Sequence, residues 1–241
     1  MKLTVLGKYG PFPKENGGTS SYLLEASGSF VLLDAGESSF SRLVGILPPE
    51  KIDAFVITHF HHDHVCDLGV YSYYFERLAL SGKLAEKPLL FCPDDESAIS
   101  SFYLSSPYFQ AVEVRDGLTY SHKGKSFTFY KTAHPVSSYG VKISDGEKTF
   151  SFMGDTNVCE NLPSLAGGAD FLLADGCFRF SDWSDKKPHL SVRHCVDLSR
   201  KYGATTLITH INPSYDEDVL RSDIAGENGV FIAEEFKTYD I

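Results

Sequence analysis

Short apolar runs, rich in β-branched and aromatic residues, alternate along this chain with stretches whose apolar positions recur at helical spacing. The runs end at clusters of Gly, Pro, Asn, Asp and Ser, which is typical of buried strands. This pattern predicts strands at 3–6, 21–26, 30–34, 54–58, 89–92, 111–115, 127–133, 139–144, 148–153, 170–174 and 205–209, and closing strand structure over 229–240. The second and third of these form a hairpin around Ser27-Gly28.

Four helices are predicted between these strands, and the apolar positions of three follow helical spacing. Their markers are Phe40, Leu43, Val44 and Leu47, stopped by Pro48-Pro49; Leu68, Tyr71, Phe75, Leu78 and Ala79, ending near Gly82; and Val192, Cys195, Val196, Ser199 and Tyr202, capped by Ser191. Asp94 is in a position to cap a further helix that runs through Tyr103. Many strands in both halves, with helices between them, predict an α/β fold with two packed sheets covered by helices. No segment has the composition of a linker, so we predict one domain over residues 1–241.

Composition narrows the class of protein. Hydrophobic residues make up 42% and charged residues 22% of the chain, as in a globular protein with a sizeable core. The formal net charge of −10 disfavours broad binding to nucleic acid or to anionic membranes. A phosphate substrate stays compatible with this charge, because bound metal ions reverse the local field.

Cysteine usage and the absence of targeting signals indicate a cytoplasmic protein. The five cysteines are scattered and form no C-x-x-C motif, which argues for reduced thiols. The first residues form a predicted strand, and no apolar stretch approaches the roughly 20 residues of a membrane helix.

The densest chemistry follows the predicted strand 54–58. There the chain reads H-x-H-x-D-H, so His59, His61, Asp63 and His64 share one tight loop at the carboxyl edge of a sheet. Neutral imidazoles suit zinc, manganese or iron, and a carboxylate adds charge and a hard oxygen. One such loop can offer ligands to two adjacent metals. The alternative is a solvated loop with a chance cluster of histidines, and the spacing of four potential ligands argues strongly against it.

Three more candidate ligands each follow a predicted strand. His134 comes after 127–133, Asp155 after 148–153 and His210 after 205–209. A single histidine after a strand is more often structural than a metal ligand. Three such residues in a chain that already carries H-x-H-x-D-H reverse that expectation.

Together these residues resemble, in order, the five motifs of the metallo-β-lactamase superfamily. Four segments carry this resemblance: Thr58 to His64, His134, Gly154-Asp155-Thr156 and Thr209-His210. The resemblance implies a four-layer αββα sandwich of two mixed β-sheets with helices outside. It also implies two divalent metal ions, zinc first and manganese or iron as alternatives, bridged by Asp155 and a hydroxide. The implied ligands are His59, His61 and His134 for one metal and Asp63, His64 and His210 for the other, with Asp63 also a candidate catalytic residue.

Within that superfamily the chain looks like the branch that contains RNase Z and phosphodiesterases. The matching segments are 154–162, His134-Pro135-Val136 with Tyr139-Gly140, and His189-Leu190-Ser191. True β-lactamases typically have a cysteine at the position of Asp155, and glyoxalase-type thioesterases continue differently after it. Flavodiiron-type reductases share the ligands, but the chain shows no flavin domain.

The resemblance implies further roles outside the ligand set. His189 would face the substrate and Asp175, at a position where the family usually has Glu, would orient it. Asp34 and Asp67 are candidates to support the metal loop, and Asp67 alternatively caps the helix that follows. A surface histidine beside a helix cap is the plain alternative for His189.

Three functions are therefore compared: a dinuclear phosphodiesterase, a thioesterase or lactonase on the same site, and a metal-binding protein without hydrolytic activity. The third is weakened because every motif position is filled. RNase Z enzymes that process transfer RNA carry a basic, Gly-rich arm, in the bacterial form between the positions of His134 and Asp155, and this chain has no room for it there. We therefore predict a small phosphodiester substrate, such as a cyclic or short nucleotide, in a cleft lined by Gly10-Pro11-Phe12 and the His189 loop. An RNase Z-like endonuclease is the main alternative, nucleic acid is disfavoured as a partner, no membrane is expected, and a homodimer is compatible with the resemblance.

Overall fold

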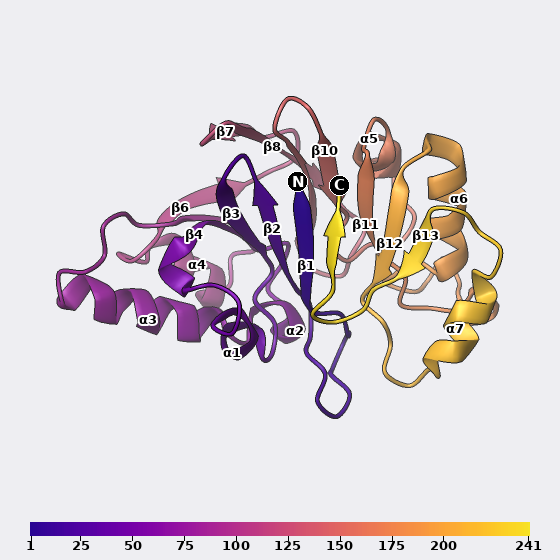
Figure 1. The fold of residues 1–241 in the computed structure, drawn as a ribbon, viewed down its shortest axis with the longest axis horizontal. Coiled ribbons are helices and arrows are strands. Elements are labelled where there is room, and N and C mark those ends of the chain that lie inside the picture. Colours follow the sequence, from indigo (N-terminus) through magenta and orange to yellow (C-terminus); the bar gives the residue numbers. More distant parts are fainter.

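Two seven-stranded β-sheets lie face to face in the computed structural model, which describes residues 1–241 (Figure 1). The first sheet has the order β14-β1-β2-β3-β4-β5-β6. Its strands are β1 (Lys2–Gly7), β2 (Ser21–Ala26), β3 (Ser29–Leu33), β4 (Ile52–Val56), β5 (Leu89–Pro93), β6 (Gln110–Val114) and β14 (Thr238–Asp240). Pairing is antiparallel from β14 to β3 and parallel from β3 to β6, so this sheet is mixed.

The second sheet is also mixed and has the order β13-β12-β11-β10-β9-β8-β7. Its strands are β7 (Thr119–His122), β8 (Lys125–Lys131), β9 (Tyr139–Ser144), β10 (Thr149–Phe152), β11 (Phe171–Asp175), β12 (Thr205–Thr209) and β13 (Val230–Ile232). The strands from β10 to β13 are parallel and those from β7 to β10 antiparallel. The parallel strands place their carboxyl ends at one edge.

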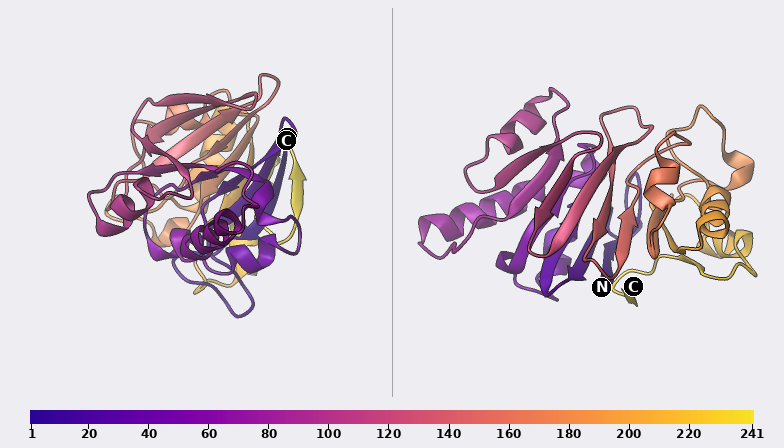
Figure 2. Two further views of the ribbon diagram at one scale, coloured as in Figure 1. Left: turned by 90° about the vertical axis from the view of Figure 1, so that its left-hand side faces the viewer. Right: turned by 90° about the horizontal axis from the view of Figure 1, so that it is seen from above.

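Helices cover the outer face of each sheet, as the views in Figure 2 show. Over the first sheet lie α1 (Ser39–Leu43), α3 (Leu68–Leu80) and α4 (Ala98–Leu104), with the short α2 (His62–Val65) between them in sequence. Over the second lie α5 (Leu162–Ala166), α6 (Val192–Tyr202) and α7 (Glu217–Asp223). Two 3-10 turns, η1 (Pro49–Lys51) and η2 (Phe180–Asp182), complete the set.

Three separate apolar clusters hold these layers together. One fills the space between the sheets, with Leu24, Phe91 and Phe150 among its buried members. A second joins α5, α6 and α7 to the second sheet, and a third joins α1, α3 and α4 to the first. Three buried layers separate four layers of secondary structure, so the αββα prediction is confirmed.

Several element boundaries differ from the predictions for local reasons. The first helix ends at Leu43, ahead of Gly45, whereas its predicted apolar stripe runs to Leu47. Ser97, not Asp94, caps α4, since its side chain accepts a hydrogen bond from the Ser100 N–H at 3.1 Å. The closing segment splits into β13 and β14, which belong to different sheets, so the chain crosses between them after Ile232.

No helix in the structure combines the length and the apolar character that crossing a membrane requires.

Candidate metal centre

The loop after β4 meets the end of β8 at the first group of donors. His61 Nδ1 lies 3.0 Å from His59 Nε2 and 3.0 Å from His134 Nε2. Tetrahedral zinc with Zn–N bonds of 2.0–2.1 Å holds its ligand atoms about 3.3 Å apart. Three imidazoles that face one another at this spacing are therefore arranged like ligands around a common ion.

The second group lies beside the first and draws on β12. Asp63 Oδ2 is 3.2 Å from His210 Nε2 and 3.5 Å from His64 Nε2. All three side chains are buried, and α2 carries two of them, because the chain turns into a helix at His62 directly after the first two histidines. That turn is why His59 and His61 face one group while Asp63 and His64 face the other.

Asp155, at the end of β10, lies between the two groups. Its Oδ2 is 3.6 Å from His59 Nε2, 3.8 Å from His134 Nε2, and 3.3 Å from both His64 Nε2 and His210 Nε2. A single carboxylate oxygen thus contacts donors of both groups. The structure brings all seven predicted ligands together: His59, His61, Asp63, His64, His134, Asp155 and His210.

Hydrogen bonds on the outer side of the rings fix which nitrogen faces inward. His64 Nδ1–H donates to Asp34 Oδ2 at 2.7 Å, and His134 Nδ1–H donates to the carbonyl of Pro188 at 3.2 Å. His59 Nδ1–H donates to Thr58 Oγ1 at 3.0 Å, and Thr58 Oγ1–H in turn donates to Asp34. With its proton on Nδ1, each of these rings in its neutral form offers Nε2 to the centre, as a metal ligand requires. Burial lowers the pKa of His64, but Asp155, Asp34 and Asp63 outweigh it and raise that pKa, so this ring holds a second proton that a metal ion has to displace.

The charges of the site favour a cation. Burial raises the pKa of Asp63 and Asp155, but the neighbouring His64 and His210 rings hold both pKa values below the usual range, so both carboxylates are ionised. Burial lowers the pKa values of His59 and His134, which keeps these imidazoles neutral. The same donor atoms suit zinc and also accept manganese or iron.

Two buried ring nitrogens of the predicted ligands, His64 Nε2 and His210 Nδ1, have no hydrogen-bond partner in the protein. His64 Nε2 is shielded from solvent and makes no hydrogen bond, while its Nδ1 is held by Asp34. A buried polar atom without a partner is costly unless something else binds it. The position of His64 Nε2 between Asp63 and Asp155 fits a divalent cation, so the residues present fit the metals that the motif implies.

Asp34 supports both groups from a single position at the end of β3. Its Oδ1 accepts from the Thr58 N–H at 2.8 Å, and its Oδ2 accepts from His64. Its backbone has φ 54°, which is uncommon for a residue other than glycine, and His210 shares this feature with φ 54°. Strained backbone at two residues that contact the centre is consistent with selection for function over local stability.

We expect Asp34→Asn to weaken metal binding by roughly 10–100-fold, because the amide cannot accept from His64 and Thr58 at once. Competition with a chromophoric chelator would measure the affinity. Asp53→Asn is the matched control: Asp53 also accepts a backbone N–H, that of Phe30 at 2.8 Å, but at the start of β4, far from the loop. Equal affinities in the two variants would contradict the role of Asp34.

His189 and Asp175 lie beside the metal ligands. His189 Nδ1 is 2.8 Å from Asp175 Oδ2, which accepts its hydrogen, and the His189 ring stacks on His210 with 4.6 Å between ring centroids. Burial lowers the pKa of His189, but the Asp175 carboxylate outweighs it and raises the pKa to about 9. The shorter aspartate therefore reaches its histidine.

Gly10 forms part of the same wall. A Cβ atom at this position would lie 2.0 Å from His210 Nε2, so only glycine allows the backbone to pass this close to a ligand. The segment is held by the Gly10 N–H, which donates to the carbonyl of Ile211 at 3.2 Å. Phe12 follows with a side chain that is 55% exposed.

Asp67 has a different role from the two that the sequence suggested. Asp67 Oδ2 accepts from the Phe40 N–H at 2.8 Å, so it joins α1 to α3; its side chain neither caps α3 nor contacts a ligand histidine. Two residues that sequence reasoning missed are Asn157 and Trp183, which bind the loop that carries His189. Their contacts link loops that are distant in sequence, and no local pattern signals them.

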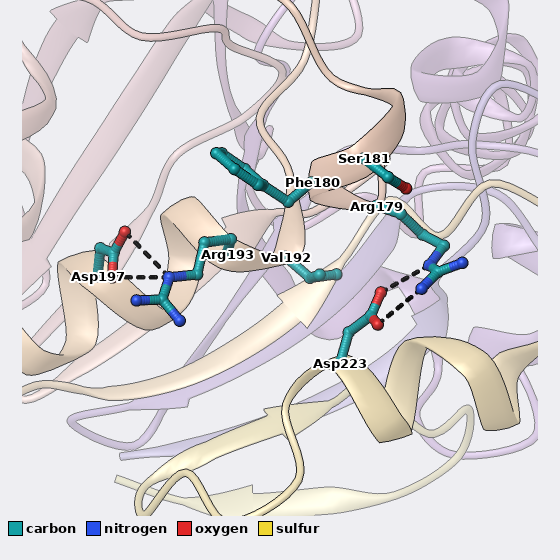
Figure 3. A pocket seen from close by; sticks show the side chains of 7 residues that line it. All are labelled: Arg179, Phe180, Ser181, Val192, Arg193, Asp197 and Asp223. Atoms are coloured by element: carbon teal, nitrogen blue, oxygen red, sulfur yellow. Dashed lines mark hydrogen bonds and ion pairs between the residues drawn. The ribbon is translucent and has the colours of Figure 1, made fainter.

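A cavity of about 570 Å³ lies apart from these ligands, between η2, the start of α6 and the end of α7 (Figure 3). Its two arginines are already paired, Arg179 with Asp223 at 2.7 Å and Arg193 with Asp197 at 3.2 Å. None of the seven ligands lines it. This cavity is therefore separate from the candidate metal centre.

Comparison with known proteins agrees with this geometry. The family model described as "Beta-lactamase superfamily domain" matches residues 30–211, a span that contains all seven predicted ligands. The probable metallo-hydrolase YhfI of Bacillus subtilis is 28% identical over 224 residues, covering 92% of each chain. Ribonuclease Z of Methanosarcina acetivorans is 20% identical, covering 100% of this chain and 98% of its own length.

Solved structures confirm the fold. The crystal structure of YhfI from Bacillus subtilis superposes with a TM-score of 0.87 at 26% identity, covering 99% of this chain and 98% of its own. A diphosphatase of the PhnP family superposes with a TM-score of 0.73 at 19% identity, covering 100% and 97%. The chain therefore belongs to the beta-lactamase superfamily, as a hydrolase with the metallo-β-lactamase fold.

Proposed function

We propose that this protein is a dinuclear metal-dependent phosphodiesterase that acts on small phosphodiesters. The observation that carries this proposal is the position of Asp155 Oδ2, within 3.3–3.8 Å of ligand nitrogens from both donor groups. Two divalent ions bound there, zinc first, supply a nucleophile at neutral pH and stabilise charge on the displaced oxygens. A site with donors for only one ion would not need a carboxylate in this central position.

The remaining residues provide proton transfer and access. His189 is fixed through Nδ1 by Asp175, so its Nε2 is free to donate a proton to the leaving oxygen of the ester. Asp63 is ionised and lies beside His210, so it supplies negative charge within the second donor group. Gly10 allows the segment Gly10-Pro11-Phe12 to pass directly against His210 on one side of the site.

Relatives support a phosphorus ester as substrate. Ribonuclease Z and the diphosphatase of the PhnP family both act, by name, on bonds at phosphorus. This chain is about equally distant from both, with 20% identity to Ribonuclease Z and 19% to the diphosphatase, so neither name by itself selects the kind of phosphorus compound. Our choice of a phosphodiester over a thioester or a lactone therefore combines this likeness with the His189–Asp175 pair.

The shape of the chain favours a small substrate. The segment between His134 and Asp155 is taken up by β9, β10 and the tight turn between them, where the Asp145 N–H donates to the Lys148 carbonyl at 3.2 Å. Together with a net charge of −10, this leaves no basic arm at that place to hold an RNA backbone. Exposed Phe12 offers a face on which a nucleobase can stack.

The test is a substrate panel with matched metals. Protein loaded in turn with zinc, manganese and iron would be offered bis(p-nitrophenyl) phosphate, a glutathione thioester and a homoserine lactone. We expect turnover of the phosphodiester, and none in the Asp155→Ala variant, which controls for a contaminating hydrolase. Hydrolysis of the thioester or the lactone alone would overturn the proposal.

An RNase Z-like endonuclease is the second candidate, and the full-length alignment with Ribonuclease Z favours it. A competition at physiological salt separates the two. Precursor transfer RNA with a 3′ trailer would compete with cyclic AMP, cyclic GMP and a dinucleotide. We expect turnover of the small diesters; site-specific trailer cleavage without it would establish the endonuclease instead.

A further inference from the structure

Asn157 is a buried polar residue, 7% exposed, that no ligand set or dyad uses. Its Nδ2 faces three backbone carbonyls of one loop, those of Lys187 at 2.5 Å, Asp185 at 3.2 Å and Ser184 at 3.4 Å. Its Oδ1 accepts from the Val158 N–H at 2.7 Å and from Trp183 Nε1–H at 3.2 Å. The amide therefore has only one orientation that satisfies these partners.

The loop that Asn157 holds is the one that ends in His189. Trp183 Nε1–H also donates to the carbonyl of His189, at 3.0 Å, so the indole bridges Asn157 and the backbone of His189. On the other side, the Asn157 N–H donates to the carbonyl of Ala133 at 2.9 Å, next to the ligand His134. Asn157 itself comes two residues after the ligand Asp155. One residue thus joins the His189 loop, through its side chain, to the two strand ends that carry Asp155 and His134, through its backbone.

Outside these hydrogen bonds, the loop is held by His134 Nδ1–H, which donates to the carbonyl of Pro188, and by Lys187 Nζ, which lies over the Phe178 ring. Its sequence from Ser184 to Lys187 is polar and mostly exposed, so apolar packing cannot set its position. Fixing the loop matters because displacement of a catalytic group by about 1 Å can cost up to about 100-fold in rate. Hydrogen bonds from a buried amide are a rigid way to set that position.

We infer that Asn157, with Trp183, is a positioning pair that sets the distance between His189 and the metal centre, and so tunes proton donation to the leaving group. This inference rests on the proposed role of His189. It goes beyond the dyad, because Asp175 sets the rotation of the ring whereas Asn157 sets the position of the backbone that carries it.

Asn157→Asp is the decisive variant, since it keeps the size of the side chain and places a carboxylate against three carbonyls. We expect about 10–100-fold lower turnover of a diester with a poor leaving group, and a much smaller loss with a diester whose leaving group is p-nitrophenolate. Metal content should not change. In combination with His189→Ala, the variant should add little to the loss of His189→Ala alone, because both act on one step.

Asn161→Asp is the matched control. Asn161 is also an asparagine whose Nδ2 donates to a backbone carbonyl, that of Lys131 at 2.9 Å, but it is only half-buried and makes no hydrogen bond to the His189 loop. Its turnover of both diesters should equal that of the wild type. Trp183→Phe, which keeps an aromatic ring and loses the N–H, should reproduce the loss of Asn157→Asp in weaker form.

A second readout needs neither metal nor substrate. Trp183 is the single tryptophan of the chain, so its fluorescence reports on this loop alone. Asn157→Asp should increase quenching by acrylamide in the metal-free protein, and Asn161→Asp should not. Unchanged quenching in Asn157→Asp, or equal losses with good and poor leaving groups, would overturn the inference. If the substrate panel showed hydrolysis of the thioester or the lactone alone, the phosphodiester proposal would fail. The role of Asn157 would then be tested in the same way, with good and poor leaving groups within that class of substrate.

Discussion

Replacing Asp155 by alanine should abolish hydrolysis and leave the fold intact. Its Oδ2 is the one oxygen that lies within 4 Å of Nε2 in four ligand histidines: His59, His64, His134 and His210. Its removal takes a charge from both donor groups at once. We therefore expect a loss greater than the roughly 10²–10⁴-fold that a single general acid contributes.

Metal analysis separates a missing bridge from a misfolded protein. Asp155→Ala should bind fewer than two ions per chain while its circular dichroism stays that of the wild type. Asp155→Asn removes the negative charge and keeps the size of the side chain, and it should lose most of the activity too. Asp170→Ala is the control, because Asp170 lies just before β11, binds the Thr149 N–H at 2.8 Å and contacts no ligand. Two ions bound to Asp155→Ala with activity near wild type would refute the bridging role.

The candidate ligands could be found from the sequence because four of them follow a predicted strand and the others share the H-x-H-x-D-H loop. Apolar runs end just before His59, His134, Asp155 and His210, and parallel strands bring such ends to one edge. His134 follows the predicted strand 127–133, and the structure has this strand as β8, which ends at Lys131 and alternates between buried and half-buried residues over most of its length. The fold class followed from the same alternation of strands and helices.

Short elements escaped prediction for lack of length. Helix α7 (Glu217–Asp223) and helix α5 (Leu162–Ala166) cover too few turns to show helical periodicity, and the edge strand β7 (Thr119–His122) is half exposed and polar. The ligand-bearing helix α2 is a single turn whose residues are selected for metal donors and not for helix formation. Tertiary contacts decide these segments.

The support of the site was only partly visible in the sequence. Asp34 could be named because it too ends a strand, and the structure places it against His64 and Thr58. Asn157 and Trp183 could not, since one amide that satisfies three carbonyls some thirty residues away leaves no periodic trace. Positions set by loop-to-loop hydrogen bonds require the structure.

The second large effect concerns His189. His189→Ala should reduce turnover of a diester with a poor leaving group by roughly 10²–10⁴-fold, because such an oxygen needs a proton as it departs. The loss should be far smaller with bis(p-nitrophenyl) phosphate, because its leaving group, p-nitrophenolate, departs as an anion without a proton. Metal content should equal that of the wild type, since His189 Nδ1 is engaged by Asp175. His122→Ala is the control, as His122 pairs with Lys125 at the start of β8, the end away from His134.

The pH profile gives the sign of the effect. Because Asp175 raises the pKa of His189 to about 9, the ring is protonated and able to donate below that pH. Turnover of the diester with a poor leaving group should therefore fall as the pH rises through this pKa, which gives the profile a basic limb. Bound cations oppose protonation of His189, so they move this limb to lower pH. Asp175→Asn removes the carboxylate charge and should shift the limb to still lower pH. A wild-type limb that is the same in His189→Ala, or equal losses with both leaving groups, would assign proton donation to another group.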